Sequence, residues 1–258
     1  MDRASNRSRI EKKLDSKKNL FIGYITGGDP SLSHTEEMVY AMERGGADLV
    51  EIGIPYSDPL ADGPTIQRAA GRALKGDFSI EKLFDSIVRI RENTDLPLVF
   101  LVYYNTIHTY GVELFAHKCR ESGIDGLIVP DLPLEECRDF PQDIIPLIPL
   151  VALNSGERIK DILKNRSGFV YCISSFGVTG SRSSISDKTR EMVEKVRAHT
   201  DLPIAVGFGV STREMVEEIH DYADAAIVGS SIVKVVEESG GDPDKVESFV
   251  RELIGKQI

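Results

Sequence analysis

The chain has 258 residues, 41% of them hydrophobic and 28% charged, which is ordinary for a globular protein with one large core. A formal net charge of -10 argues against nucleic acid and anionic membranes as main partners. There is no signal peptide and no apolar run of about 18 residues, so neither export nor a membrane span is expected. The 3 scattered cysteines suggest a reducing compartment, and we expect a cytoplasmic protein.

Apolar runs alternate with amphipathic stretches along the whole chain. A short helix within residues 9–14 is expected to cap one end of the core. Eight strands are predicted, at residues 19–25, 49–54, 98–105, 126–129, 148–153, 168–174, 201–209 and 225–228. Helices are predicted at residues 32–44, 67–75, 80–90, 112–122, 134–140, 157–163, 187–198, 212–219, from 232 onward and 243–254.

This repetition of strand and helix defines the expected fold. Eight such units in a chain of this length favour a closed (β/α)8 barrel, a single TIM-barrel domain over residues 1–258 with a short N-terminal helix. A short motif ending in aspartate also recurs before three strands, at Asp48, Asp125 and Asp224. An open doubly wound sheet is the alternative, but no shift in composition divides the chain into two halves.

The most informative stretch is residues 48–67, where a buried strand runs into a loop stiffened by proline and glycine. Glu51 interrupts the apolar strand, and Asp58 and Asp62 lie in the loop. A bare carboxylate in such a strand costs several kcal/mol unless it is paired or its pKa moves. These acids would have a purely structural role if Glu51 bonded a backbone group at the strand end and Asp58 and Asp62 were turn residues. Three acids at the carboxyl end of one strand favour a functional site.

An anion site is predicted at the ends of the last two strands. Residues 207–209 read Gly-Phe-Gly and residues 229–231 read Gly-Ser-Ser, each just before a helix. Glycines allow a close backbone approach, and a helix N-terminus offers unpaired N–H groups to phosphate. Tight turns without a ligand are the alternative. The Gly- and Ser-rich segment after the sixth strand is the best candidate for a lid, with Gly177 and Gly180 as further donors.

The sequence at residues 51–67, E-I-G-I-P-Y-S-D-P-L-A-D-G-P-T-I-Q, closely resembles the signature of the tryptophan synthase alpha chain family. The resemblance covers nearly the whole chain and keeps the family's order. The other matching motifs are Y-I-T-G-G-D-P, L-V-Y-Y-N at 101–105, V-P-D-L-P at 129–133, G-V-T-G at 177–180, G-F-G-V at 207–210 and V-G-S-S-I-V-K at 228–234.

The resemblance implies a lyase that cleaves indole-3-glycerol phosphate to indole and glyceraldehyde 3-phosphate by retro-aldol chemistry. By position, Glu51 is the proton-transfer residue, Asp62 the carboxylate that faces the indole N–H, and Thr179 a lid residue that contacts the catalytic aspartate on closure. The implied phosphate-binding residues are Gly180, Gly209, Gly229 and Ser230. The implied indole-pocket residues are Tyr24, Ile66, Leu101, Tyr103, Asp131, Tyr171 and Phe208.

The family also implies a partner, a pyridoxal-phosphate-dependent beta chain that receives the indole within an α2β2 heterotetramer. The loop of residues 55–62, including Asp58, resembles part of that contact surface. No cofactor or metal is expected in this chain itself. The lid departs from the familiar pattern at Ser175 and Phe176, which makes it more apolar, and Gly27 stands where leucine is common.

The chemistry accounts for two unlike carboxyl groups. Protonation of indole C3 and deprotonation of the side-chain hydroxyl suit one acid with a raised pKa, a role that fits Glu51. A second carboxylate that stays ionised, here Asp62, stabilises the positive ring nitrogen. The alternatives are another phosphate-binding barrel, such as a sugar-phosphate isomerase or indole-glycerol-phosphate synthase, whose strand-end Lys or Glu pattern is not found, and a non-catalytic subunit that activates a partner.

Overall fold

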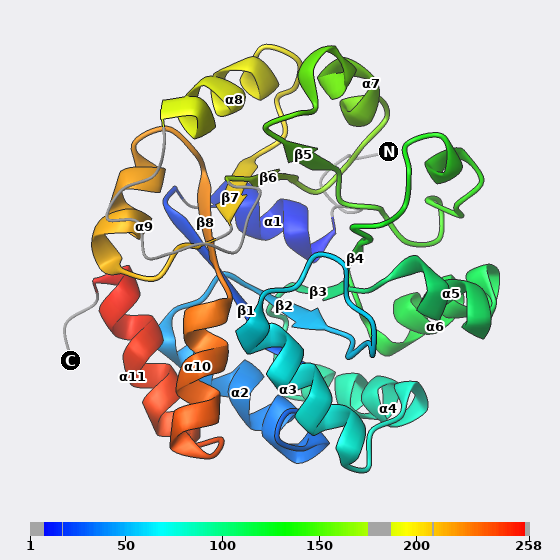
Figure 1. The fold of residues 1–258 in the computed structure, drawn as a ribbon, viewed down its shortest axis with the longest axis vertical. Helices are drawn as coiled ribbons and strands as arrows, with labels where there is room; N and C mark the ends of the chain where they lie inside the picture. The colour runs from blue at the N-terminus through cyan, green and yellow to red at the C-terminus, as the bar shows by residue number, and fades with distance from the viewer. Residues whose placement is uncertain (1–7, 17, 175–186, 208, 256–258) are drawn as a thin grey trace.

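The computed structural model describes residues 8–16, 18–174, 187–207 and 209–255, in which helices surround a central ring of strands (Figure 1). Eight parallel strands pair in the order β4-β3-β2-β1-β8-β7-β6-β5, and a parallel bridge between Leu127 and Leu147 joins the two ends. The sheet is therefore a closed barrel, as predicted, and not an open doubly wound sheet. The strands are β1 Leu20–Thr26, β2 Leu49–Gly53, β3 Leu98–Leu101, β4 Gly126–Ile128, β5 Leu150–Ala152, β6 Val170–Ile173, β7 Ile204–Gly207 and β8 Ala225–Val228.

Four of the outer helices, α2, α4, α9 and α11, begin at a polar side chain that caps them. Ser31, Ser79, Thr212 and Asp242 each accept a hydrogen bond from a backbone N–H in the first turn that follows. The helices are α1 Arg9–Ser16, α2 Leu32–Gly45, α3 Pro64–Lys75, α4 Ile80–Arg91, α5 Tyr104–Tyr110, α6 Val112–Ser122, α7 Ile159–Leu163, α8 Asp187–Arg197, α9 Arg213–His220, α10 Ser230–Ser239 and α11 Pro243–Ile254, with 3-10 turns η2 Glu136–Arg138 and η3 Gly156–Arg158.

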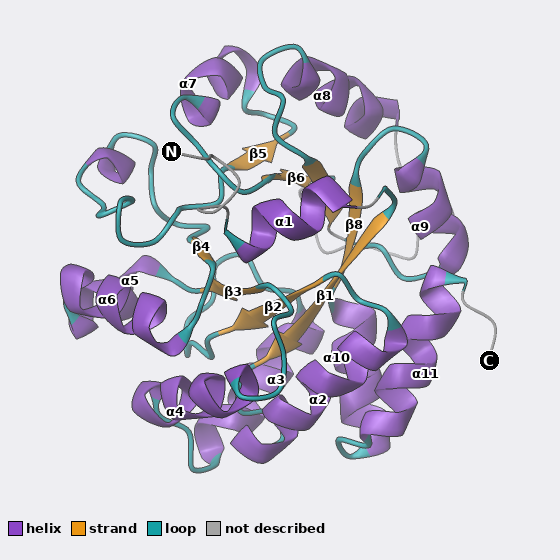
Figure 2. Ribbon diagram, turned by 180° about the vertical axis from the view of Figure 1, so that it is seen from behind, coloured by secondary structure: helices purple, strands orange, loops and turns teal. Residues whose placement is uncertain are grey.

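Helix α1 covers the amino end of the barrel, as the sequence predicts. It lies behind the strands in Figure 1 and crosses in front of them in Figure 2. Its apolar side chains Ile10 and Leu14 are buried, and they pack with the inward-facing residues of the strands in one cluster. A second, larger cluster fills the layer between the barrel and the outer helices. The two layers together form the core.

The three aspartates of the repeated motif clamp pairs of strands together. The carboxylates of Asp48, Asp125 and Asp224 accept hydrogen bonds from the backbone N–H groups of Phe21, Leu98 and Ile204 at 3.0, 2.9 and 2.7 Å. The backbone N–H of each aspartate donates in return to the carbonyl oxygen of the same partner residue. The clamps therefore join β1 to β2, β3 to β4 and β7 to β8 at their amino ends.

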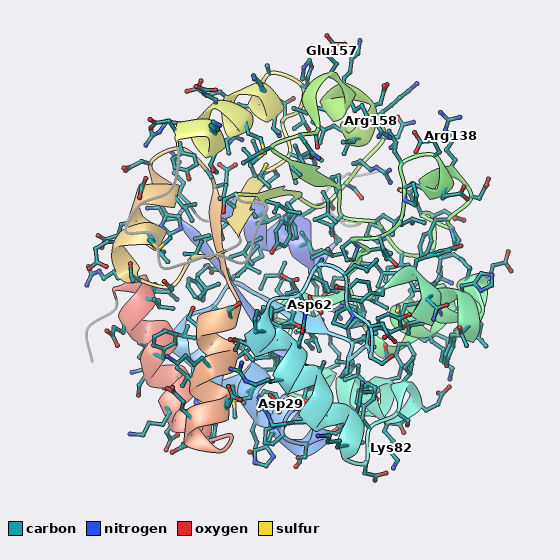
Figure 3. All side chains as sticks on the ribbon, viewed as in Figure 1. Asp29, Asp62, Lys82, Arg138, Glu157 and Arg158 are labelled. Atoms are coloured by element: carbon teal, nitrogen blue, oxygen red, sulfur yellow. The ribbon has the colours of Figure 1, made fainter. Side chains whose placement is uncertain are left out.

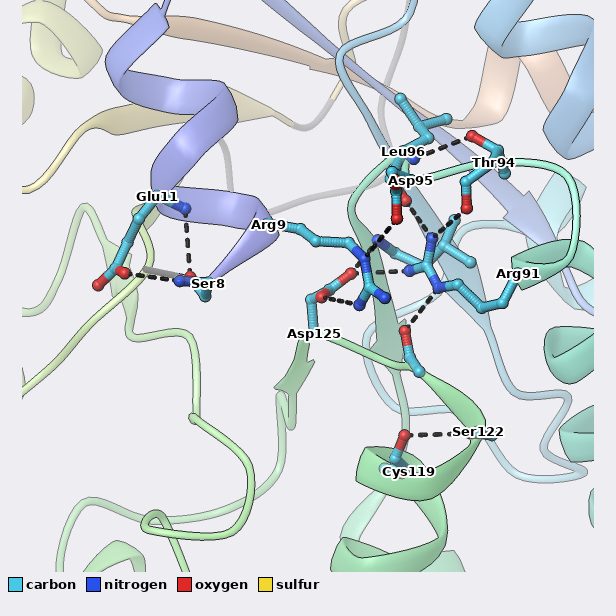
Figure 4. A network of polar contacts seen from close by, with 12 residues as sticks. Ser8, Arg9, Glu11, Arg91, Thr94, Asp95, Leu96, Cys119, Ser122 and Asp125 are labelled. Carbon is cyan, nitrogen blue, oxygen red and sulfur yellow. Dashed lines mark hydrogen bonds and ion pairs between the residues drawn. The ribbon is translucent and has the colours of Figure 1, made fainter. Parts of the chain in front are cut away.

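The clamp at Asp125 also holds helix α1 (Figure 4). Arg91 donates to Asp125 at 2.8 Å, and Arg9 of α1 donates to the other carboxylate oxygen at 3.0 Å. Three further N–H groups of Arg91 donate to backbone carbonyls, including that of Leu96 at 2.6 Å. Four of the five N–H groups of this largely buried guanidinium are thus hydrogen-bonded, which offsets much of the cost of burying its charge.

Several elements differ in extent from the prediction, and β3, the helix at residues 134–140 and β5 are among them. Strand β3 ends at Leu101 instead of residue 105, because the chain turns there into helix α5. Asp131, from the loop after β4, accepts a hydrogen bond from the N–H of Tyr104 at 2.8 Å and so fixes the start of α5. The helix predicted at residues 134–140 is only the 3-10 turn η2, and β5 is shorter than residues 148–153.

Candidate active site

Glu51 lies in the middle of β2, opposite Tyr24 of β1. It is 1% exposed, and its Oε2 atom has no hydrogen-bond partner among the described residues. Burial, with a smaller contribution from the negative charge of Asp62, raises the pKa of Glu51 to about 8. At neutral pH this carboxyl group is mostly protonated, as a proton donor must be.

Asp62 lies in the loop between β2 and α3, at the carboxyl end of the barrel (Figure 3). Burial raises its pKa to about 6, and a hydrogen bond with the Tyr103 side chain opposes that rise. The pKa of Asp62 thus lies above its usual value, because the side chain is largely desolvated. At neutral pH Asp62 is still mostly ionised while Glu51 holds its proton.

Tyr103 anchors the loop that carries Asp62. Its hydroxyl oxygen accepts a hydrogen bond from the N–H of Ala61 at 2.9 Å. Its ring stacks on Tyr56, with ring centroids 5.1 Å apart. Tyr56 and Ala61 were not among the site residues predicted from the sequence, because only the folded loop brings them to Tyr103.

Two buried tyrosines lie close enough to Glu51 for its negative charge to contribute to raising their pKa values, after burial itself. They are Tyr24 of β1 and Tyr171 of β6. The Tyr24 hydroxyl forms a hydrogen bond with Thr26 at 3.3 Å, a contact that the sequence did not reveal. Gly53 is required beside it, because a Cβ atom at that position would collide with the Tyr24 hydroxyl. Both phenols remain neutral beside the carboxyl group.

The predicted indole-pocket residues fall into distinct places. Tyr24 packs with Ile66 and Leu101 in one small apolar cluster, together with Ala69 of α3 and Val233 of α10. Tyr103 lies at Asp62, and Tyr171 lies near Glu51. Asp131 is exposed, binds the backbone of α5 as described above, and contributes with its charge to the raised pKa of Tyr103.

The predicted phosphate-binding turns lie at the same mouth of the barrel as Glu51 and Asp62, since they follow β7 and β8. Gly229 directly precedes α10, and no side chain caps that helix N-terminus. Gly209 has a φ of 82°, and a Cβ atom there would meet only open space. The Ser231 hydroxyl donates to the Val210 carbonyl at 3.2 Å and ties the two turns together. Ser230 is exposed at the mouth. The free N–H groups of α10 suit an anion.

Several predictions lie outside the described residues: the lid residues Thr179 and Gly180, Phe208 of the indole pocket, and the departures at Ser175 and Phe176. Within the described ranges, no group of three or more His, Cys, Asp or Glu side chains is placed to hold a metal ion. None of the helices in that part of the chain combines the length and apolar character needed to cross a bilayer.

A closed parallel barrel with two unlike carboxyl groups and an open helix N-terminus at one mouth defines a (β/α)8-barrel protein built for acid–base chemistry on a small anionic ligand. The comparisons with known proteins narrow this class. A family model described as tryptophan synthase alpha chain matches residues 10–257. The tryptophan synthase alpha chain of Alkaliphilus metalliredigens is 44% identical over 263 residues, which cover 98% of this chain and 97% of that protein.

Solved structures agree. A chain of the tryptophan synthase α2β2 complex from Pyrococcus furiosus superposes with a TM-score of 0.87 at 36% identity, covering 93% of this chain and 99% of that chain. A chain of Mycobacterium tuberculosis tryptophan synthase superposes with a TM-score of 0.88 at 33% identity, covering 97% and 98% of the two chains. This chain belongs to the tryptophan synthase alpha chain family. It is accordingly a carbon–carbon lyase of tryptophan biosynthesis that cleaves indole-3-glycerol phosphate to indole and glyceraldehyde 3-phosphate.

Proposed function

We propose that Glu51 and Asp62 are the two groups that carry this cleavage, Glu51 as the residue that shuttles the proton and Asp62 as the ionised partner of the indole N–H. One observation supports the proposal above all. Two carboxyl groups at one mouth of the barrel are held in environments that move their pKa values to about 8 and about 6. Such a separation assigns the acid and the base in many enzymes.

The proton balance closes on Glu51 alone. The neutral carboxyl group donates its proton to indole C3, which places positive charge on the ring nitrogen. Asp62, as a carboxylate, accepts the N–H hydrogen bond and stabilises that charge. The Glu51 carboxylate then takes the proton of the side-chain hydroxyl while the carbon–carbon bond breaks and the aldehyde forms. The bonding electrons return to the ring, so indole leaves neutral and Glu51 is protonated again.

The glycerol phosphate end is assigned to the turns after β7 and β8. The backbone at Gly209 and Gly229 and the hydroxyl of Ser230 would bind the phosphate, since the N-terminus of α10 is open. Thr179 and Gly180 of the lid complete the site on the strength of the family resemblance. The apolar end of the substrate then lies against Tyr24 and its neighbours, Ile66 and Leu101 among them.

The proposed assembly follows from the relatives. The Pyrococcus furiosus structure is that of an α2β2 complex, and we assign the same kind of partner to this single-domain chain. The loop of residues 55–62 is placed in the contact surface, with Asp58 exposed and Leu60 87% exposed within it. An exposed leucine of this kind is favourable when a partner covers it. Pyridoxal phosphate then belongs to the beta chain, and the complex to the cytoplasm.

The test replaces each carboxyl group by its amide. Glu51→Gln cannot release and recover a proton, and Asp62→Asn cannot balance the ring charge, so each should lower the cleavage rate about 10²- to 10⁴-fold. The rate is measured as release of glyceraldehyde 3-phosphate, and circular dichroism confirms that the fold persists. Asp58→Asn, assayed like the other two variants in the chain without its beta partner, is the matched control, because it changes an exposed carboxylate of the same loop. Near-full activity of either amide variant would refute that residue's assignment.

A further inference from the structure

Four charged side chains join the loop after β1 to helices α3 and α10. They are Asp29, Arg68, Arg72 and Glu237, hereafter called the strap. Arg72 donates from Nε and Nη2 to the two carboxylate oxygens of Asp29, both at 2.8 Å. Its third nitrogen, Nη1, donates to Glu237 at 2.6 Å. Arg68 forms a second fork on Glu237, at 3.0 and 2.8 Å. Figure 3 labels Asp29 between the ribbons of α3 and α10.

The strap is more than an exposed pair of charges. The Asp29 side chain is 2% exposed, and those of Arg72 and Glu237 are 32% and 28% exposed. Two parallel N–H bonds in each fork fix the guanidinium plane as well as its distance from the carboxylate. The two Arg68 and Arg72 side chains lie on one face of α3, because they are one helical turn apart. The strap therefore sets the position of α3 along α10.

Each of these helices begins at one half of the site. Helix α3 starts at Pro64, two residues after Asp62, and α10 starts at Ser230, beside Gly229. Neither N-terminus is capped by a side chain. Between the helices lies Tyr24, packed against Ala69 of α3 and Val233 of α10. A shift of α3 along α10 would therefore change the distance between the carboxylate that faces the aromatic ring and the turn that binds phosphate.

We propose that the strap is a positioning device that sets the spacing between the aromatic and phosphate halves of the site, with Glu237 and Arg72 as its positioning residues. This inference rests on the function proposed above. The substrate spans both halves, so a misplacement of one half penalises the joined molecule but not an isolated ring or an isolated phosphate. Binding of the two fragments thus distinguishes a spacing role from a general loss of structure.

The test uses Glu237→Ala in the full chain, because it releases α10 and leaves the buried Asp29–Arg72 fork intact. Three ligands are titrated: indole, glycerol 3-phosphate, and an indole joined to a phosphate by a propyl chain. The joined ligand should bind about ten-fold more weakly, and kcat/KM for indole-3-glycerol phosphate should fall by a similar factor. Each fragment alone should change by less than about two-fold. Glu237→Gln, which keeps an acceptor oxygen for Arg68, should recover part of the loss.

The matched control is Glu36→Ala. Glu36 accepts two hydrogen bonds from Arg89, at 3.0 and 2.7 Å, and so joins α2 to α4, neither of which begins at the proposed site residues. It should leave the affinity for the joined ligand unchanged. Equal losses for all three ligands, or an equal effect of Glu36→Ala, would overturn the spacing role. Failure of the proposed function looks different, since Asp62→Asn in the otherwise unchanged chain would then leave binding of indole and of the joined ligand intact.

Discussion

The two carboxyl groups show how the same chemical group is tuned by its surroundings. Glu51 is enclosed by a strand, two phenol rings and the neighbouring charge of Asp62, whereas Asp62 keeps a hydrogen bond from Tyr103. The protonated Glu51 and the ionised Asp62 coexist only between their two pKa values. The site thus has a defined working range of pH.

The pH profile of kcat/KM should be bell-shaped. Below about pH 6 Asp62 gains a proton and loses the charge that, in the proposed mechanism, stabilises the ring nitrogen. Above about pH 8 Glu51 loses the proton that it must donate. Steady-state rates of aldehyde release from pH 5 to 9.5 measure both limbs, at about 6 and about 8. In the residual activity of Asp62→Asn the acid limb should disappear, and an unchanged limb would assign it to another group.

At the residue scale, much of the proposed site was predicted from the sequence. An acid inside the apolar run of β2 cannot be an ordinary surface residue, so the sequence indicates Glu51 as a candidate site residue. The desolvation of Asp62 could not be predicted, because it depends on Tyr103 and on the folding of the loop back over the barrel. The strap was also missed, since Arg68 and Arg72 at helical spacing look like a solvated face until Asp29 and Glu237 are placed beside them.

At the scale of the elements, the aspartate clamps convert a short repeat into paired strands. Each carboxylate accepts a hydrogen bond from a backbone N–H near the amino end of the neighbouring strand. Asp125 is 6% exposed and is shared by two arginines, whereas Asp224 is 39% exposed and binds Arg197 alone. The same motif should therefore contribute unequally to stability.

Replacing these aspartates by alanine should separate the two cases. Asp125→Ala leaves the buried Arg91 without its counter-charge, and should lower the free energy of unfolding by about 3 kcal/mol. Asp224→Ala should lower it by about 1 kcal/mol, because water compensates for the lost carboxylate. Urea unfolding followed by circular dichroism measures both values. Equal losses in the two variants would show that the burial of Asp125 does not determine its contribution.

Element boundaries mark the limit of sequence reasoning at this scale. The apolar run at residues 98–105 indicates one long strand, and nothing local shows that α5 begins at Tyr104. The start of α5 depends on Asp131, a residue far along the chain whose side chain binds the Tyr104 N–H. Strand and helix existence is thus predicted by periodicity, whereas strand length is fixed by contacts between distant segments.

At the scale of the whole molecule, the ring of strands has one weak seam. The clamps join β1 to β2, β3 to β4 and β7 to β8, and none of them joins β4 to β5. Between β4 and β5 the sheet is closed only by the bridge of Leu127 with Leu147. This part of the barrel should open more readily than the rest.

Amide hydrogen exchange in the native state tests this. Opening of the seam should let the N–H groups of Leu127 and Ile148, which bridge the gap at 2.9 and 2.8 Å, exchange with solvent. They should exchange about ten-fold faster than that of Val50, which donates to the Pro97 carbonyl between the fully paired strands β2 and β3. Mass spectrometry of peptides over residues 49–54, 124–129 and 144–153 gives the comparison. Equal protection throughout would show that the bridge alone closes the barrel as firmly as full strand pairs do.

Helix α1 determines which end of the barrel is accessible to small molecules. Ile10 and Leu14 of α1 pack against the side chains that fill the barrel interior, so the helix closes the amino end of the barrel. In the proposed mechanism the substrate therefore reaches Glu51 from the opposite rim, which carries Asp62 and Gly229. A protein that docks on that rim would then cover the face through which substrate arrives and products leave.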